Sequence, residues 1–136
     1  MDSGRSFRAI LRFLAASMRQ WRMFRARSRE LLRSESEKRG IELLREWLSA
    51  QQRVQFDKHW YFDVIGCQSG KRYRIHYGTG TNIYELDQYG RPKSGWCFVP
   101  NEPLVSGDVM LAQKIALETD EQGTLAVAKS FRPNWH

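Results

Sequence analysis

Residues 66–78, GCQSGKRYRIHYG, bring a cysteine, a serine, a histidine and three basic side chains together within a short stretch. If this stretch is a strand, one face carries Arg72, Arg74 and His76 and the other carries Tyr73 and Ile75. Arginine and aromatic side chains exposed on a strand can contact phosphates and stack on bases. The RNA-recognition pattern, however, requires glycine after its first basic residue, and Arg72 stands there instead. We therefore expect an ordinary hairpin strand with Tyr73 and Ile75 buried and a basic face exposed.

Metal coordination and nucleophilic catalysis are the other chemistries that these residue types could support. Zinc could use Cys67, Cys97, His59 and His76, but no C-x₂-C or H-x₃-H pair is present. Both cysteines lie in apolar segments, which favours buried thiols over ligands. Ser69 stands one place too late for a G-x-S-x-G elbow and is better interpreted as a turn residue. The sequence predicts no metal site and no cofactor.

Two further patterns also fail to indicate a catalytic site. Glu85 and Asp87 share one face of a predicted strand, where paired carboxylates are expected to be solvated. The segment GTGTN, residues 78–82, lacks the following helix and the Gly-Lys-Ser/Thr of a phosphate-binding loop. We therefore predict a protein that is not an enzyme.

The net charge of +7 is concentrated near the N-terminus. Residues 1–36 contain nine arginines, no lysine and three acids, which gives 9 − 3 = +6. Residues 59–136 contain eight basic and eight acidic side chains and are neutral. Such asymmetry indicates a basic arm that contacts nucleic acid or an anionic membrane surface.

The arm itself is predicted to be an amphipathic helix over residues 5–33. Its apolar face consists of Phe7, Ile10, Leu11, Leu14, Met18 and Trp21, and Arg8, Arg12, Arg19 and Arg22 follow an adjacent face. This face could dock on the rest of the protein, lie on a membrane surface, or fill the groove of a partner. Closely spaced arginines equally suit RNA or DNA.

The leading hypothesis is a non-enzymatic binding module whose arm engages a polyanion, with nucleic acid as the favoured ligand. The residues assigned to phosphates are Arg19, Arg22, Arg25, Arg27 and Arg29, with Trp21 and Phe24 stacking or wedging and Arg72 and Arg74 extending the patch. The alternative is a protein-interaction adaptor that binds a partner, a second copy or a membrane surface. Its interaction face is Ile10, Leu11, Leu14, Met18 and Trp21.

The remaining chain predicts an α+β domain over residues 37–136. A helix is expected from Ser34 to Ser49, and a capping box of Ser49 and Gln52 begins another over residues 50–58. Short aromatic and β-branched segments then predict an antiparallel meander of about four strands, at residues 60–67, 71–78, 82–87 and 95–100. One or two helices within residues 106–129, breaking near Thr119, are expected to pack on this sheet. Ser106 is the expected cap, and Gln113, Lys114 and Glu118 are the expected polar side.

Residues 60–122 resemble a small family of uncharacterised bacterial proteins, mainly from rhizobia and related α-proteobacteria. The shared features are Tyr73-Arg74-Ile75, Asn82-Ile83, Leu86-Asp87, Cys97 and the run Leu111–Lys114. The resemblance covers about half of the chain, leaves residues 1–36 outside, and implies a cytoplasmic bacterial protein without assigning functional residues.

A cytoplasmic location also agrees with the sequence itself. The apolar run near the N-terminus is interrupted by Arg12, unlike a secretory signal, and no apolar run reaches the ~18 residues of a membrane span. Two cysteines are too few for a disulfide scaffold.

Overall fold

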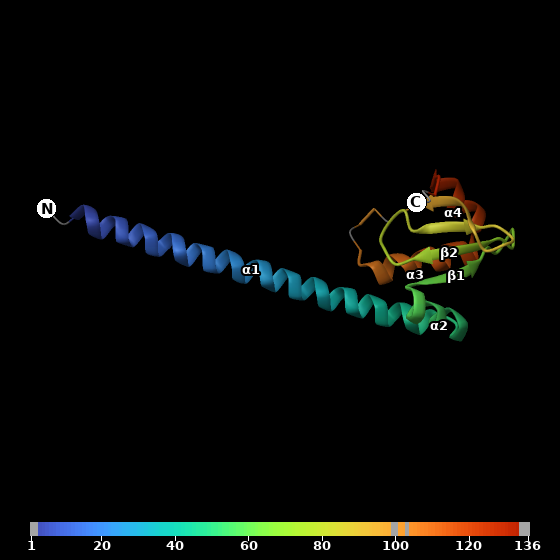
Figure 1. The fold of residues 1–136 in the computed structure, drawn as a ribbon, viewed down its shortest axis with the longest axis horizontal. Helices are drawn as coiled ribbons and strands as arrows, with labels where there is room; N and C mark the ends of the chain where they lie inside the picture. Colours follow the sequence, from blue (N-terminus) through green and yellow to red (C-terminus); the bar gives the residue numbers. More distant parts are fainter. Residues whose placement is uncertain (1–2, 99–100, 103, 134–136) are drawn as a thin grey trace. The chain divides into compact units, whose positions relative to one another are not determined.

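The computed structural model describes residues 3–98, 101–102 and 104–133, and the chain divides into two units, Met1–Ser36 and Glu37–His136. The helices are α1 (Ser3–Trp47), α2 (Ala50–His59), α3 (Ser106–Thr119) and α4 (Glu121–Val127). The strands are β1 (Tyr61–Ile65), β2 (Arg72–His76), β3 (Ile83–Leu86), β4 (Pro92–Cys97) and β5 (Lys129–Phe131). Figure 1 shows these elements along the chain, and the predicted α+β class is confirmed.

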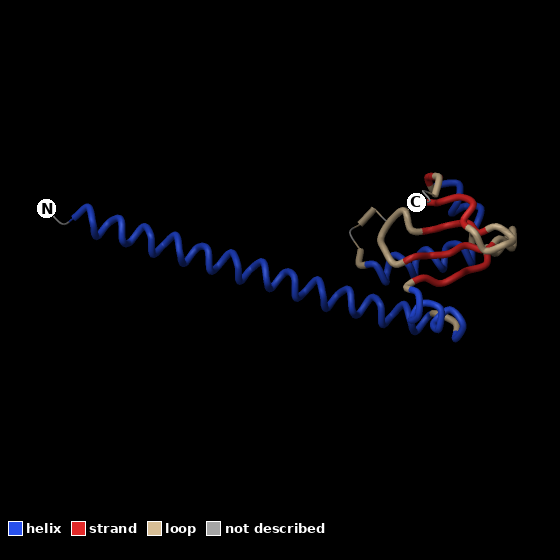
Figure 2. The backbone as a smooth tube through the Cα atoms, viewed as in Figure 1, coloured by secondary structure: helices blue, strands red, loops and turns tan. Residues whose placement is uncertain are grey.

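The sheet is an antiparallel meander in which neighbours in sequence are neighbours in space, in the order β1-β2-β3-β4-β5 (Figure 2). The predicted meander is therefore confirmed, although the sheet has one strand more than expected. Lys129, predicted as helical, instead begins the three-residue strand β5. So short a strand depends on pairing with β4 and has no periodicity of its own for sequence reasoning to detect.

One face of the sheet forms the core of the second unit. Phe62 and Val64 on β1, and Tyr73 and Ile75 on β2, are at most 1% exposed, which confirms the predicted inward face of residues 66–78. They pack with Leu44, Leu48, Phe56, Ile83, Met110 and Leu117 from the helices and from β3. Helix α3 lies alongside β1 and β2 (Figure 1), and the predicted break after Thr119 separates it from α4.

The predicted helix boundary at Ser34 is wrong, because α1 continues from Ser3 to Trp47. No glycine or proline interrupts residues 25–39, so nothing in the backbone opposes helix there. Glu37, expected to complete a cap with Ser34, instead accepts hydrogen bonds from Ser106 N at 3.4 Å and from the Tyr77 hydroxyl at 3.2 Å. Ser106 is the first residue of α3 and provides no side-chain cap, contrary to prediction.

The C-terminal part of α1 and the start of α3 approach each other through two glycines. A Cβ atom on Gly107 would lie 2.1 Å from the carbonyl carbon of Gly40, and one on Gly40 would lie 2.7 Å from Val105 Cγ2. Only hydrogen atoms fit at this crossing, so both glycines are needed for the helices to pack.

Two polar residues predicted to face solvent lie in the core. Gln113 is 1% exposed and exchanges hydrogen bonds of 2.9 and 3.0 Å with Asn82, itself 4% exposed. Glu85 is 5% exposed and lies 3.2 Å from Lys71 Nζ. The predictions failed because each residue finds its partner on an element distant in sequence, which local patterning does not reveal. Helix α2, by contrast, begins at the predicted capping box of Ser49 and Gln52.

Candidate functional site

Among the described carboxylic acids, Glu121 at the start of α4 has the most strongly shifted pKa. The residue is 2% exposed, and its carboxylate accepts hydrogen bonds from Gln68 N (3.1 Å), Ser69 N (2.7 Å), the Tyr73 hydroxyl (2.6 Å) and the Ser69 hydroxyl. Burial would raise the pKa of this carboxyl, but the hydrogen bonds from Ser69, Tyr73 and the backbone outweigh it and lower the pKa to about 2. The same burial, together with Glu121, raises the pKa of Tyr73.

The Glu121 cluster has the composition of a catalytic site but the geometry of an anchor. Both carboxylate oxygens accept from donors of the β1–β2 hairpin, and almost none of the residue is open to a substrate. Perturbed acids often mark active sites, yet structural networks perturb them too. We interpret Glu121 as the group that fixes α4 to the β1–β2 hairpin. Ser69 lies in the turn of this hairpin, which confirms the prediction that it is a turn residue.

The residues considered for zinc do not converge. Among the described residues, no group of three or more His, Cys, Asp or Glu side chains is placed to hold a metal ion. The expectation of buried thiols is also wrong, because Cys67 is exposed and Cys97 is half-buried. Cys67 follows β1 in the turn, where the chain leaves the core, and its sulfur accepts a weak contact from Glu121 N at 3.5 Å.

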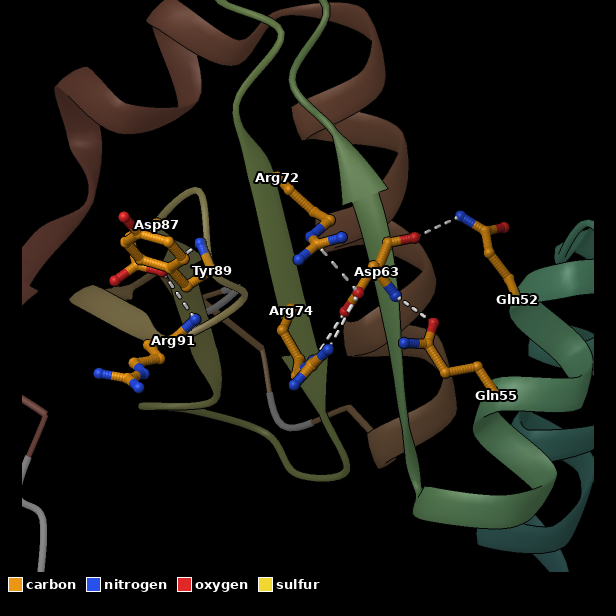
Figure 3. Close-up of polar contacts among 8 residues, drawn as sticks. All are labelled: Gln52, Gln55, Asp63, Arg72, Arg74, Asp87, Tyr89 and Arg91. Atoms are coloured by element: carbon orange, nitrogen blue, oxygen red, sulfur yellow. Dashed lines mark hydrogen bonds and ion pairs between the residues drawn. The ribbon is translucent and has the colours of Figure 1, made fainter.

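The second face of the sheet, which we call the outer face, carries an ion-pair cluster centred on Asp63 (Figure 3). Arg74 Nε and Nη2 donate to the two carboxylate oxygens of Asp63 at 2.8 and 3.1 Å, and the guanidinium lies 4.1 Å from the centre of the Tyr61 ring. The hydrogen bond to Asp63 raises the pKa of Arg74 against the opposing effect of burial. Arg72 Nε is 3.8 Å from Asp63, beyond hydrogen-bonding range, and its side chain is 45% exposed.

Helix α2 closes the exposed edge of β1 through two glutamines (Figure 3). Gln52 Nε2 donates to the backbone oxygen of Asp63 at 2.9 Å, and Asp63 N donates to Gln55 Oε1 at 2.8 Å. An edge strand otherwise offers unpaired backbone groups to other chains. The i, i+3 spacing of the two glutamines on one helix face matches the donor and acceptor of a single strand residue.

Aromatic rings form a row across the outer face, which we call the ring row. It consists of Tyr61 on β1, His76 on β2, Tyr84 on β3 and Phe131 on β5, with successive ring centroids 5.1, 5.2 and 5.6 Å apart. Beyond its β1 end, His59 stacks on Tyr61 at 5.1 Å. All four rings of the row are half-buried, so part of each surface is open to solvent.

Two hollows border the ring row. One, of about 480 Å³, is lined by Arg74, His76, Thr81, Asn82 and Tyr84, among others. The other, of about 660 Å³, lies against α2 and is lined by Gln52, Gln55, His59, Tyr61 and Arg72, among others. Burial, assisted by the positive charge of Arg74, lowers the pKa of His76, which keeps its ring neutral at pH 7.

In the first unit, the structure places the predicted arginines on a regular helix. Arg8, Arg12, Arg19 and Arg22 are exposed and, at 3.6 residues per turn, share one side of α1. Within the described part of the chain, their side chains have no hydrogen bond or ion pair. Arg25 is exposed as well. The side chains of Trp21, Phe24, Arg27 and Arg29, to which stacking and phosphate contacts were assigned, lie outside the described residues.

The predicted apolar face of α1 is also exposed. Ile10, Leu11, Leu14 and Met18 retain between 50% and 59% of their surface. Contiguous apolar surface of this kind is typical of an interaction site. No helix among the described residues is long and apolar enough to cross a membrane.

Comparison of the chain with models of protein families, with curated proteins and with solved structures finds no match. The resemblance to rhizobial proteins therefore stays a prediction, and the function must be inferred from the geometry alone.

Proposed function

We propose that the protein is a non-enzymatic nucleic-acid-binding module that uses the arginine row of α1 to engage phosphates. The observation that carries this proposal is the row Arg8, Arg12, Arg19 and Arg22, exposed along one side of a helix. From Arg8 to Arg22 the row extends roughly 21 Å, at 1.5 Å per residue, enough to follow several consecutive phosphates. The thiols of Cys67 and Cys97 are unpaired, which suits a protein acting in the reducing cytoplasm.

The charge distribution supports the same proposal. Residues 1–36 carry +6 of the total +7, which leaves +1 for residues 37–136. Guanidinium groups that neutralise phosphates release condensed counterions, so affinity depends on salt. We expect the logarithm of the binding constant for duplex DNA to fall with the logarithm of salt concentration, with a slope of roughly −0.9 per phosphate neutralised.

Anisotropy of labelled duplex DNA and RNA over a salt series tests the proposal. The variant replaces Arg8, Arg12, Arg19 and Arg22 with glutamine, which keeps helix propensity and removes four charges. The matched control replaces Lys38, Arg39, Arg91 and Lys129, all exposed in the second unit, with glutamine. We expect the first variant to bind more weakly with a flatter salt slope, and the control to change little. Equal losses in both variants, or a parent with no salt dependence, would contradict the proposal.

A second candidate function is favoured by the exposed apolar face of α1. Ile10, Leu11, Leu14 and Met18 would suit the groove of a partner protein, a second copy of the chain, or an anionic membrane surface. Molar mass measured by light scattering over a concentration series separates self-association from the other two. If self-association is the function, mass rises with concentration, the rise is lost in Leu14→Asp, and salt has little effect.

A further inference from the structure

The ring row is built by the register of the sheet. Tyr61 stands opposite His76, and Tyr84 stands opposite Gly95, which in turn faces Phe131. A Cβ atom on Gly95 would lie 2.2 Å from Phe131 Cε2, so the glycine makes room for the Phe131 ring to reach Tyr84. Four strands thus place their aromatic side chains in one line on the face opposite the core.

The charge beside this line is positive. Asp63 accepts two hydrogen bonds from Arg74, which neutralises its charge, and the guanidinium of Arg74 also lies over the Tyr61 ring. Arg72, from the same strand as Arg74, has no carboxylate within hydrogen-bonding distance in the described cluster and remains 45% exposed. Two arginines against one aspartate leave this part of the outer face with a charge of +1 next to open aromatic surface.

A ligand can reach the rings through the two hollows. The smaller one is bounded by His76 and Tyr84, and the larger one by Tyr61 and Arg72. A ligand that crosses β1, β2 and β3 along the ring row would meet both hollows. Its chemistry should combine flat rings, which stack on aromatic side chains, with negative charge, which Arg72 would contact.

We propose that the outer face of the sheet binds the bases of single-stranded nucleic acid, which stack on His76 and Tyr84 while Arg72 contacts a phosphate. Bases in a duplex are stacked on one another, so only a single strand can present them to such a row. This inference deepens the proposed function, on which it rests for the polyanionic nature of the ligand. It adds base contacts, and one phosphate contact through Arg72, on the sheet to the phosphate contacts of the arm.

The test uses the full chain and two oligonucleotides of about eight nucleotides, a length within the site sizes known for stacking surfaces. One is oligothymidylate, and the other is an abasic strand with the same phosphates and no bases. To reduce the contribution of the arm, the measurements are made in the four-glutamine arm variant and repeated in the parent at roughly 0.5 M salt, where surface charges are screened.

Tyr84→Leu is the main substitution, and Tyr89→Leu is the matched control because Tyr89 is 76% exposed in the β3–β4 turn and, among the described residues, makes no ring contact with the ring row. Stacking of one base is worth about 1–3 kcal/mol, so Tyr84→Leu should weaken oligothymidylate binding by roughly 5- to 150-fold. It should leave abasic binding unchanged, and Tyr89→Leu should alter neither. Arg72→Gln, at a side chain whose Nε lies 3.8 Å from Asp63 and makes no hydrogen bond to it, should weaken binding of both strands several-fold and provides a test that does not alter the rings.

The contrary outcomes are distinct. Equal affinity for the two strands, or equal affinity of Tyr84→Leu and Tyr89→Leu for oligothymidylate, overturns the assignment of the outer face and leaves the arm proposal standing. Binding of a proline-rich peptide that is sensitive to Tyr84→Leu, without binding of oligothymidylate, overturns it in favour of a peptide groove.

If thermal unfolding shows that Tyr84→Leu does not fold, two other measurements test the proposal. They are the effect of Arg72→Gln and the amide chemical-shift changes of residues 61–84 on adding oligothymidylate. Shifts confined to residues outside the outer face would refute the proposal.

Discussion

Arginine side chains are used differently in the two units of the protein. In residues 37–136, Arg74 holds both oxygens of Asp63, Arg45 pairs with Asp57 at 2.8 Å, and Arg53 donates to the backbone oxygen of Arg45 at 3.0 Å. In the first unit, Arg8 and Arg12 are exposed and, among the described residues, without such partners. An arginine that is paired with a carboxylate stabilises the local structure, whereas an arginine without such a pair remains available to a ligand.

The hydrophobic residues show the same contrast. Core residues such as Leu44, Phe62 and Ile75 are fully buried, whereas Ile10 and Leu14 are more than half exposed. Stability of the second unit should therefore depend on its own buried contacts. Substitutions in residues 8–22 should alter binding and leave stability nearly unchanged.

The largest loss of stability is expected for Glu121→Gln. The amide would bring its own N–H groups against the N–H and O–H donors of the β1–β2 turn, and loss of a buried, hydrogen-bonded charge costs about 3 kcal/mol. Urea unfolding measures this loss, with the exposed Glu46→Gln as control. Binding of duplex DNA under conditions where the variant remains folded should be unaffected. A loss of less than about 0.5 kcal/mol would show that Glu121 is not the anchor of α4.

The same carboxylate predicts a dependence of stability on acid. Its pKa is about 2 in the folded protein and near 4.3 in an unfolded chain, so between these values the unfolded state binds the additional proton. The contribution of Glu121 is complete above about pH 4.5 and is lost as the pH falls towards 2. Thermal unfolding from pH 6 to pH 2 should show a shallower decline in Glu121→Gln than in the parent. Parallel curves would mean that the carboxyl titrates normally.

A smaller loss is expected for Gln113→Ala. Asn82 would lose its reciprocal partner inside the core, and an unsatisfied buried amide costs about 2 kcal/mol. Lys114→Ala, on the next residue of α3, serves as control because its ion pair with Glu118 is only an i, i+4 contact. The denaturant midpoint of Gln113→Ala should be lower than that of Lys114→Ala. The reverse order would contradict the assignment of Gln113 to the core.

A still smaller loss, with a specific consequence, is expected for Gln55→Ala. It removes one hydrogen bond from the backbone of Asp63, worth about 1 kcal/mol. Because the edge of β1 is then partly open, aggregation monitored by static light scattering should increase on mild heating. Gln51→Ala, at an exposed position of the same helix, should have neither effect. Unchanged aggregation would show that the glutamines are not needed to protect the edge.

The smallest effect on stability is expected for Leu14→Asp. Its side chain is 52% exposed, so the free energy of unfolding should stay within about 0.5 kcal/mol of the parent. Chemical denaturation followed by fluorescence measures it, and the buried Leu44→Ala, which should lose several times as much, is the reference. A loss in Leu14→Asp comparable to that of Leu44→Ala would show that the stability of residues 37–136 depends on the arm.

Sequence patterns were sufficient wherever a local rule decides the outcome. Alternation placed Tyr73 and Ile75 inward, and the spacing of Ser49 and Gln52 located the start of α2. The same reasoning failed at Ser34, where cap spacing occurs inside a continuous helix. It also failed for Cys67, because a residue just beyond a strand end leaves the core even in an apolar segment.

The N-terminal charge and the exposed arginine row of α1 were determined by the sequence itself, because a helix repeats every 3.6 residues whatever surrounds it. Only the tertiary structure decided that Glu121 accepts hydrogen bonds from Ser69 and that Gln113 pairs with Asn82. The same holds for the ring row, which brings four strands together. Each of these arrangements joins residues from separate elements through the register of the sheet and the packing of a helix on it. Such register and packing depend on the whole fold, whereas local periodicity reports only on one element at a time.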